Sequence, residues 1–183
     1  MPMKFKTLKC ATLNLWKINT PIGHIEITCC ESGLHSIIQT TVASPPDLSV
    51  KVSLVQGCIM DLSALVKEVL NWFTVYFKHP KATSSLCIPI ICSVVLKSDF
   101  RKKAWLHLAS EIQAGETVSY KKLAELIGNQ GAVRAVGSAM SNNPISIIIP
   151  CHRVIKSNGD IGKYAGGFKN DVKKWLLEFE RNS

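Results

Sequence analysis

Hydrophobic and polar residues alternate along the first third of the chain, as they do in β-strands. Isoleucines alternate with polar residues over 22–27, and after the turn residues 31–33 a second apolar run covers 34–38. This pattern predicts a β-hairpin. Residues 43–46 contain two prolines and break regular structure, and 48–54 predict a further strand.

A helical spacing of apolar residues follows and predicts a helix that begins near Asp61 or Ser63 and ends at His79-Pro80. The residues of this stripe are Leu62, Leu65, Val66, Val69, Leu70, Phe73 and Phe77. We interpret the stripe as core and expect no chemistry from it. Residues 81–96 then form a connector that prolines interrupt.

From residue 97 the pattern is mostly helical. Ser98 caps a predicted helix that stops at Gly115, and Ser119 caps a short helix over 120–127. A third helix covers 132–140, so the two short helices predict a helix-turn-helix, although any helical bundle contains such pairs.

The last part of the chain contains one apolar run before a final helix. The sequence 145–149 predicts a buried strand that leads into 150–154. A turn at 157–160 and a loop over 162–167 follow, and Asn170 caps the last helix. We therefore expect an α/β protein in which a small N-terminal sheet-plus-helix domain, 1–96, packs on a mostly helical domain, 97–183.

The chain of 183 residues is basic, with 22 Lys+Arg against 13 Asp+Glu, a net charge of +9 and a pI near 9.3. This excess favours a polyanionic partner, nucleic acid before an acidic membrane, over a merely well-solvated basic surface. The longest apolar stretch, Cys87–Leu96, is broken by Pro89 and Ser93, so we expect no membrane span.

The seven cysteines predict reduced thiols in an intracellular protein, because residues 1–9 lack the apolar core of a signal peptide. One of them, Cys151, is followed directly by His152. A cysteine beside a histidine is a candidate nucleophile, since the attacking species is the thiolate and an activating neighbour favours it. Alone the pair is weak evidence, because most buried cysteines are inert.

The pentapeptide 150–154 and the segments around it together resemble the O6-alkylguanine-DNA alkyltransferase family. The matching segments, in the order of that family, are 117–120, 132–137, 142–144, 149–154, 164–167 and 175–177. The resemblance implies irreversible transfer of an alkyl group from guanine O6 in DNA to a cysteine of the protein, without an organic cofactor. We expect a monomer, in the nucleus if the organism is eukaryotic.

The resemblance implies a role for each residue of a reactive site. Cys151 is the acceptor, His152 is a base that acts through a water molecule, and Glu180 orients the imidazole. Asn143 holds the helix-turn-helix against the active-site loop, and Tyr120 donates a proton to the leaving base. Without the resemblance, Glu180 reads as a surface carboxylate, Asn143 as a helix cap and Tyr120 as a surface aromatic residue.

The resemblance also implies a DNA-binding face that enters the minor groove without sequence preference. Arg134 fills the gap that a flipped nucleotide leaves; the alternative is a solvent-exposed helix arginine. The other residues expected on this face are Tyr120, Lys121, Ala132, Gly137 and Lys173, with Lys122, Lys163, Lys169 and Lys174 as further phosphate contacts. Val154, Gly162, Tyr164 and Ala165 line the guanine pocket, where Ala165 replaces a serine that many family members carry.

Some eukaryotic members of the family bind a structural zinc ion in the N-terminal domain. The matching set here is Cys10, Cys30, His35 and Cys92, in which Cys92 replaces a histidine. Three cysteines and one histidine suit tetrahedral zinc, but ordinary thiols and an unliganded histidine remain the alternative. Two other functions also stay open, a DNA-binding module without chemistry and a cysteine hydrolase that uses Cys151 and His152.

Overall fold

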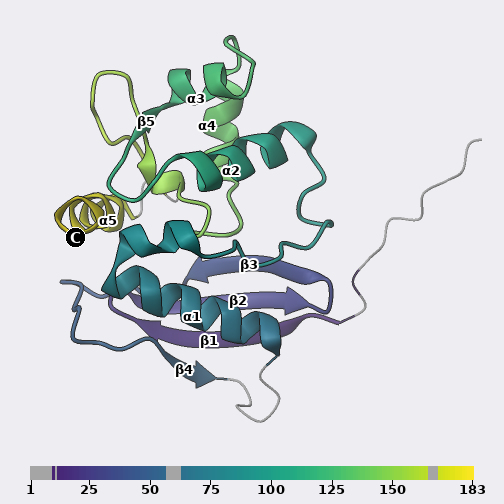
Figure 1. The fold of residues 1–183 in the computed structure, drawn as a ribbon, viewed down its shortest axis with the longest axis vertical. Coiled ribbons are helices and arrows are strands. Elements are labelled where there is room, and N and C mark those ends of the chain that lie inside the picture. The colour runs from purple at the N-terminus through teal and green to yellow at the C-terminus, as the bar shows by residue number, and fades with distance from the viewer. Residues whose placement is uncertain (1–9, 11, 57–62, 165–168) are drawn as a thin grey trace, which may run out of the picture.

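The computed structural model describes residues 10, 12–56, 63–164 and 169–183. A four-stranded antiparallel sheet occupies one side of the molecule, and the helices that follow residue 98 occupy the other (Figure 1). The strands are β1 (Asn14–Thr20), β2 (Gly23–Cys30), β3 (Gly33–Gln39) and β4 (Ser53–Gln56), in the order β3-β2-β1-β4. The predicted α/β fold with a helical C-terminal part is confirmed, and the domain boundary at residue 97 stays a prediction.

The predicted hairpin is confirmed as β2 and β3, with Ile27 opposite Ile37. β1 was not predicted, although Trp16 and Ile18 alternate in burial with their neighbours. The strand expected over 48–54 begins only at Ser53. The reason lies at Asp47, whose carboxylate accepts a hydrogen bond from the backbone N of Ser49 (2.8 Å) and so bends the chain into a turn.

α1 (Ala64–Lys78) covers one face of the sheet (Figure 1). Ser63 caps it by accepting a hydrogen bond from the backbone N of Val66, and the predicted beginning at Asp61 lies outside the described residues. Tyr76 stacks on Trp72, with ring centroids 5.3 Å apart, and meets Phe179 of α5 (Asn170–Asn182) edge-on. This aromatic cluster joins the sheet layer to the helical layer.

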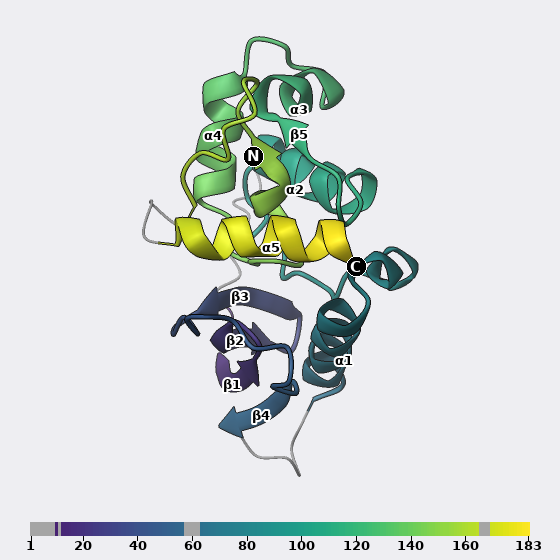
Figure 2. The same cartoon turned by 90° about the vertical axis from the view of Figure 1, so that its left-hand side faces the viewer.

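The helical layer contains α2 (Asp99–Glu111), α3 (Tyr120–Leu126), α4 (Val133–Ser141) and α5, which lies between the sheet and the other three helices (Figure 2). Ser98 and Ser119 cap α2 and α3 as predicted. Asn170 is the first residue of α5 and does not cap it; its side chain accepts a hydrogen bond from the backbone N of Tyr164 instead (2.8 Å). Across the described ranges, no helix combines the length and apolar character that a bilayer crossing needs.

The segment 145–149 is buried but is not the strand that its apolar run predicted. Its backbone folds into a turn, in which Ile149 N donates to Ile145 O at 2.9 Å and Ile147 adopts a positive φ of 74°. The edge of β3 holds this turn, because Ile37 N donates to Pro144 O and Ser146 N donates to Ile37 O. The sheet therefore positions the chain that leads directly to Cys151.

Candidate active site

Cys151 begins η2 (Cys151–Arg153), a single helical turn after the buried segment 145–149, and its side chain is 8% exposed. The side-chain amide of Asn143 donates to its Sγ at 3.1 Å and to Ile149 O at 2.8 Å. The amide oxygen of Asn143 accepts from Ile145 N at 3.0 Å. Asn143 thus holds both the thiol and the turn before it in place by hydrogen bonds. The C-cap residue of α4 is its neighbour, Asn142.

Lys173 lies among buried residues and not on a DNA-facing surface, so its prediction as a phosphate contact is wrong. Its side chain is 0% exposed, and Nζ donates to Val154 O at 2.8 Å. Burial lowers the pKa of Lys173 to about 8. Burial also raises the pKa of the Cys151 thiol, and the Asn143 hydrogen bond and the positive charge of Lys173 oppose this rise. The buried ammonium group of Lys173 therefore stabilises the thiolate form of Cys151.

His152 and Glu180 form a fully buried pair, with His152 Nε2 2.7 Å from Glu180 Oε1. Burial lowers the pKa of His152, and the carboxylate of Glu180 opposes this effect. His152 Nδ1 is buried and has no hydrogen-bond partner among the described residues. Because a carboxylate accepts from Nε2–H, the other ring nitrogen, Nδ1, is the one free to take a proton.

Glu180 also accepts hydrogen bonds from groups that the sequence analysis left without a role. Arg153 binds both carboxylate oxygens, with Nε 2.9 Å from Oε2 and Nη2 3.0 Å from Oε1. The hydroxyl of Tyr76 donates to Oε1 at 2.7 Å, and Gly115 N donates to Oε2 at 3.2 Å. Burial raises the pKa of Glu180, but His152 and Arg153 outweigh it and hold the pKa well below its usual range.

The expected guanine-binding residues gather around two short parallel strands. β5 (Val118–Ser119) pairs with β6 (Val154–Ile155), which brings Tyr120 next to the loop that contains Gly162. Gly162 has a φ of +68°, and a Cβ there would lie 3.9 Å from the Tyr120 hydroxyl. Val154 O already accepts from Lys173 but keeps a second lone pair. Tyr164 is 8% exposed, and Ala165 lies outside the described residues.

The two helices of the predicted helix-turn-helix lie at the outer end of the helical layer (Figures 1 and 2). Both helices carry exposed basic residues. Arg134 is exposed in the first turn of α4, and Lys121 is exposed in α3. A Cβ at Gly137 would meet no heavy atom within 4 Å, so this face of α4 is open, and Ala132 at its N-cap is partly exposed. Lys169 differs from these residues, because its Nζ donates to Gln39 O of β3.

Comparisons with known proteins agree on one family. Residues 99–182 match the family model of the 6-O-methylguanine DNA methyltransferase DNA-binding domain. The methylated-DNA–protein-cysteine methyltransferase of Cricetulus griseus is 42% identical over 167 residues, which cover 88% of this chain and 79% of that protein. The protein of the same name from Homo sapiens is 35% identical over 164 residues, 89% of this chain and 78% of that protein.

The chain belongs to the methylated-DNA–protein-cysteine methyltransferase family. The fold agrees, since the Mycobacterium tuberculosis OGT solved in complex with DNA aligns with a TM-score of 0.68 at 28% identity, over 92% of this chain and 93% of that chain. The resemblance first drawn from the segments 149–154 and 132–137 is therefore confirmed.

This family member also contains the predicted Cys₃His cluster. The ligand atoms of Cys10, Cys30, His35 and Cys92 all lie within 4.8 Å of one another. Cys10 Sγ and Cys92 Sγ are 3.6 Å apart, and His35 Nε2 is 3.3 Å from Cys30 Sγ. The connector reaches the hairpin at Gly33, where a Cβ would lie 2.7 Å from Ile90 O, so glycine permits this approach. The six cysteines that the structure describes are free.

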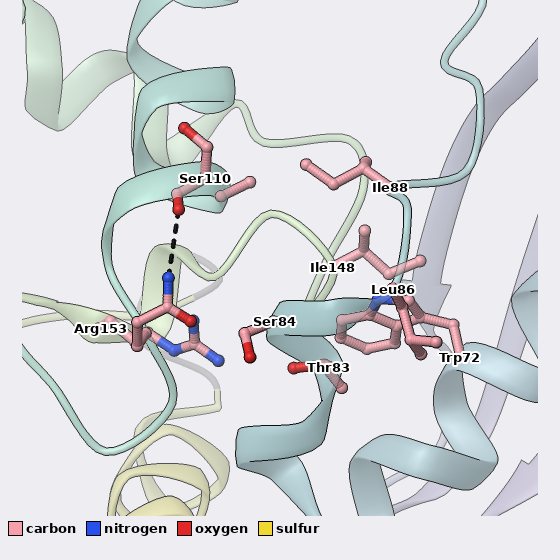
Figure 3. A pocket seen from close by; sticks show the side chains of 10 residues that line it. Trp72, Thr83, Ser84, Leu86, Ile88, Ser110, Ile148 and Arg153 are labelled. Atoms are coloured by element: carbon pink, nitrogen blue, oxygen red, sulfur yellow. Dashed lines mark hydrogen bonds between the residues drawn. The ribbon is translucent and has the colours of Figure 1, made fainter.

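Two cavities flank the reactive site. One, of about 220 Å³, is lined by Arg153, by Trp72 of α1 and Ser84 of the turn that follows α1, and by Ser110 of α2 (Figure 3). Cys151 does not line it. The other, of about 230 Å³, contains Cys151, Asn143 and Tyr164 in its wall. The second cavity is therefore the one in contact with the reactive thiol.

Proposed function

We propose that this family member repairs DNA by transferring an alkyl group from O6 of guanine to Sγ of Cys151. The observation that carries this proposal is the position of the buried thiol, which Asn143 holds beside the His152–Glu180 pair. A soft thiolate in a largely buried site suits displacement at an alkyl carbon. A DNA-binding module would not need this arrangement, and a hydrolase would not need the basic α3–α4 face.

In this mechanism, His152 Nδ1 takes the proton of Cys151 through a water molecule, and Glu180 stabilises the imidazolium. Sγ then attacks the alkyl carbon while the C–O6 bond breaks. The electron pair of the broken bond stays on O6 of guanine. The guanine takes up a proton from the Tyr120 hydroxyl, which recovers one from His152. The net result is one thioether, one repaired base and no change in the number of protons.

The thioether has no leaving group, so the protein is consumed once and needs no organic cofactor. The test is the stoichiometry of transfer from an excess of duplex that contains labelled O6-methylguanine. We expect at most one methyl group per protein molecule at any excess of DNA. Continued turnover would contradict the acceptor role and favour a hydrolytic site.

We further propose that the α3–α4 face binds duplex DNA in the minor groove without sequence preference. Exposed Arg134 and Lys121 supply charge, and the open surface at Gly137 supports close approach of the helix to the duplex. Arg134 occupies the gap that the damaged nucleotide leaves between the stacked bases when it is flipped out. The protein acts as a monomer where DNA is kept, inside the cell and in the nucleus of a eukaryote.

We also propose that Cys10, Cys30, His35 and Cys92 hold one structural zinc ion. Four ligand atoms of the soft and borderline types that zinc prefers converge in the structure, and a closed set leaves no coordination position for substrate. The ion would fasten the connector and the chain before β1 to the β2–β3 hairpin. Elemental analysis of protein purified without chelators should find about one zinc per chain. If such protein contains no zinc, the proposal of a zinc site is wrong.

A further inference from the structure

The loop between β6 and Tyr164 carries an ion pair that the proposed transfer does not use. Lys156 Nζ lies 2.7 Å from Asp160 Oδ2. The backbone closes the same loop, because Lys156 N donates to Asp160 O at 2.8 Å and Gly159 N donates to Lys156 O at 3.0 Å. The loop follows the parallel pair of β5 and β6 and rises beside α3 at the outer end of the helical layer (Figures 1 and 2). The ion pair therefore lies next to the α3–α4 face.

The stem of Lys156 also borders the proposed guanine pocket. A Cβ at Gly162 would lie 3.8 Å from Cγ and Cε of Lys156 and 3.9 Å from the Tyr120 hydroxyl. The lysine stem and this hydroxyl thus both flank Gly162. Because Lys156 is an exposed residue, its ammonium group lies at the solvent side of the pocket.

The two partners of the ion pair differ in freedom. Asp160 is fixed to the loop, since its Oδ1 accepts a hydrogen bond from Gly162 N at 2.7 Å and its own N donates to Asn158 Oδ1 at 3.1 Å. Lys156 has a flexible four-carbon stem. The side chains of the pair are 55% and 48% exposed, and such a pair contributes little to stability. The ammonium group can therefore leave Asp160 for a stronger anion, while the carboxylate stays in place.

A flipped nucleotide brings such an anion to the pocket. When its base enters beside Tyr120 and Gly162, the sugar connects that base to phosphate groups that stay outside, on the DNA backbone. A lysine ammonium binds phosphate as a point charge, and each such contact releases counterions from the DNA. In undamaged duplex the nucleotide stays in the stack, so its phosphate is not drawn toward the pocket.

We propose that Lys156 binds a phosphate group of the flipped nucleotide, and that Asp160 holds its ammonium group until that phosphate arrives. The inference rests on the proposed DNA-binding face and adds to it one contact and one residue that opposes this contact. In the free protein Asp160 neutralises Lys156, which limits attraction to undamaged duplex. At the damaged nucleotide, the phosphate replaces the carboxylate as the partner of the ammonium group.

Two variants that break the same ion pair should change the affinity for DNA in opposite directions. Lys156→Met keeps an unbranched stem, and Asp160→Asn keeps an oxygen that accepts from Gly162 N. Both are measured in the Cys151→Ala background, which cannot accept the alkyl group, by fluorescence anisotropy with O6-methylguanine duplex. Lys156→Met should weaken binding at least about threefold and make the slope of log K against log salt shallower by about one. Asp160→Asn should strengthen binding by up to about fivefold, because an exposed ion pair no longer has to break.

The double variant separates a restrained contact from a general effect of charge. In the Lys156→Met background, Asp160→Asn should change the affinity by less than about twofold, because the carboxylate then has no ammonium group to restrain. Lys67→Met and Glu68→Gln are the matched controls, since they remove single exposed charges of α1 and should leave the affinity unchanged.

Three results would overturn the inference: no loss of affinity in Lys156→Met, weaker binding in both single variants, or an Asp160→Asn gain that persists without Lys156. Weaker binding in both would show that the pair only braces the loop. A Cys151→Ala parent that does not bind duplex DNA would instead remove the proposed DNA-binding face itself, which separates the two failures.

Discussion

The hydroxyl of Tyr76 in α1 donates a hydrogen bond of 2.7 Å to Oε1 of Glu180 in α5, across 104 positions of sequence. Tyr76 is 0% exposed, and the oxygen that it reaches is also the partner of His152. The helix that covers the N-terminal sheet therefore contributes a donor to the carboxylate that supports the reactive site. We regard Tyr76 as a positioning residue, which acts on the thiol only through Glu180 and His152.

Replacing Tyr76 by Phe tests this link, because it removes one hydrogen bond and keeps the ring. A hydrogen bond to a charged group contributes about 1.5–3 kcal/mol, so we expect the free energy of unfolding in urea to fall by about that amount. The single-turnover rate of methyl transfer should fall as well, since Oε1 loses a donor that fixes it. Phe77→Leu is the control: it alters the same aromatic cluster and should lower stability while the rate of the folded protein stays unchanged.

Glu180 makes the stability of the protein depend on pH in the acid range. Its pKa in the folded protein lies well below the usual value of about 4.3, so its stabilisation is complete above that value and is lost as the pH falls through the folded pKa. Glu180→Gln should cost about 3–5 kcal/mol at pH 7 by leaving Arg153 unpaired, and this difference should shrink below about pH 4. Urea unfolding from pH 7 to 3 measures it, and a difference independent of pH would refute the assignment.

The control for that series is Glu178→Gln, because Glu178 is exposed and its oxygen lies 4.0 Å from Lys174 Nζ. An exposed pair of this kind contributes about 0–1 kcal/mol, so this variant should follow the wild type at every pH.

Arg134 should matter for DNA and not for the chemistry at the thiol. Arg134→Ala should slow transfer from O6-methylguanine in duplex DNA much more than transfer from free O6-benzylguanine, which needs no flipping; a few kcal/mol of unstacking corresponds to at least about tenfold. Lys67→Ala removes an exposed charge of α1 and should leave both rates unchanged. Equal losses on both substrates would instead assign Arg134 to folding.

The zinc proposal predicts that Cys92 tolerates histidine but not alanine. Structural zinc sites use Cys₂His₂ as well as Cys₃His sets, so Cys92→His should keep about one zinc per chain, and Cys92→Ala should lose the ion and have a lower melting temperature. Chelation should lower the melting temperature of the wild type while residual alkyl transfer continues, because the cluster lies apart from Cys151. Zinc content that does not differ between the two variants would rule out Cys92 as a ligand.

The sequence allowed prediction of those features that depend on local motifs. The hairpin, the capped helices and the Cys10–Cys92 cluster could be expected from spacing, turn residues and the family resemblance. The segment 145–149 could not, because an apolar run shows burial and does not distinguish a strand from a buried turn. Lys173 was expected on the DNA-binding face, and the sequence does not show that its side chain is instead buried, where it donates to a carbonyl oxygen of β6.

The hydrogen-bond partners of Glu180 also could not be predicted from the sequence. Tyr76 belongs to an apolar helix face, and neither its burial nor its hydrogen bond to α5 is visible in the spacing of that helix. Arg153 could have been suspected, since it follows His152 directly and a buried carboxylate needs a cation nearby. Contacts between residues so distant in sequence become visible only once the two layers are packed together.

The most direct test of the account is the mass of the protein after a single exposure to duplex DNA with O6-methylguanine. We expect the intact mass to rise by one methyl group, and digestion should locate the added mass on the peptide that contains Cys151. Cys151→Ala should bind the same duplex and gain no mass. A methyl group found on another residue, or an unchanged protein beside repaired DNA, would contradict transfer to Cys151.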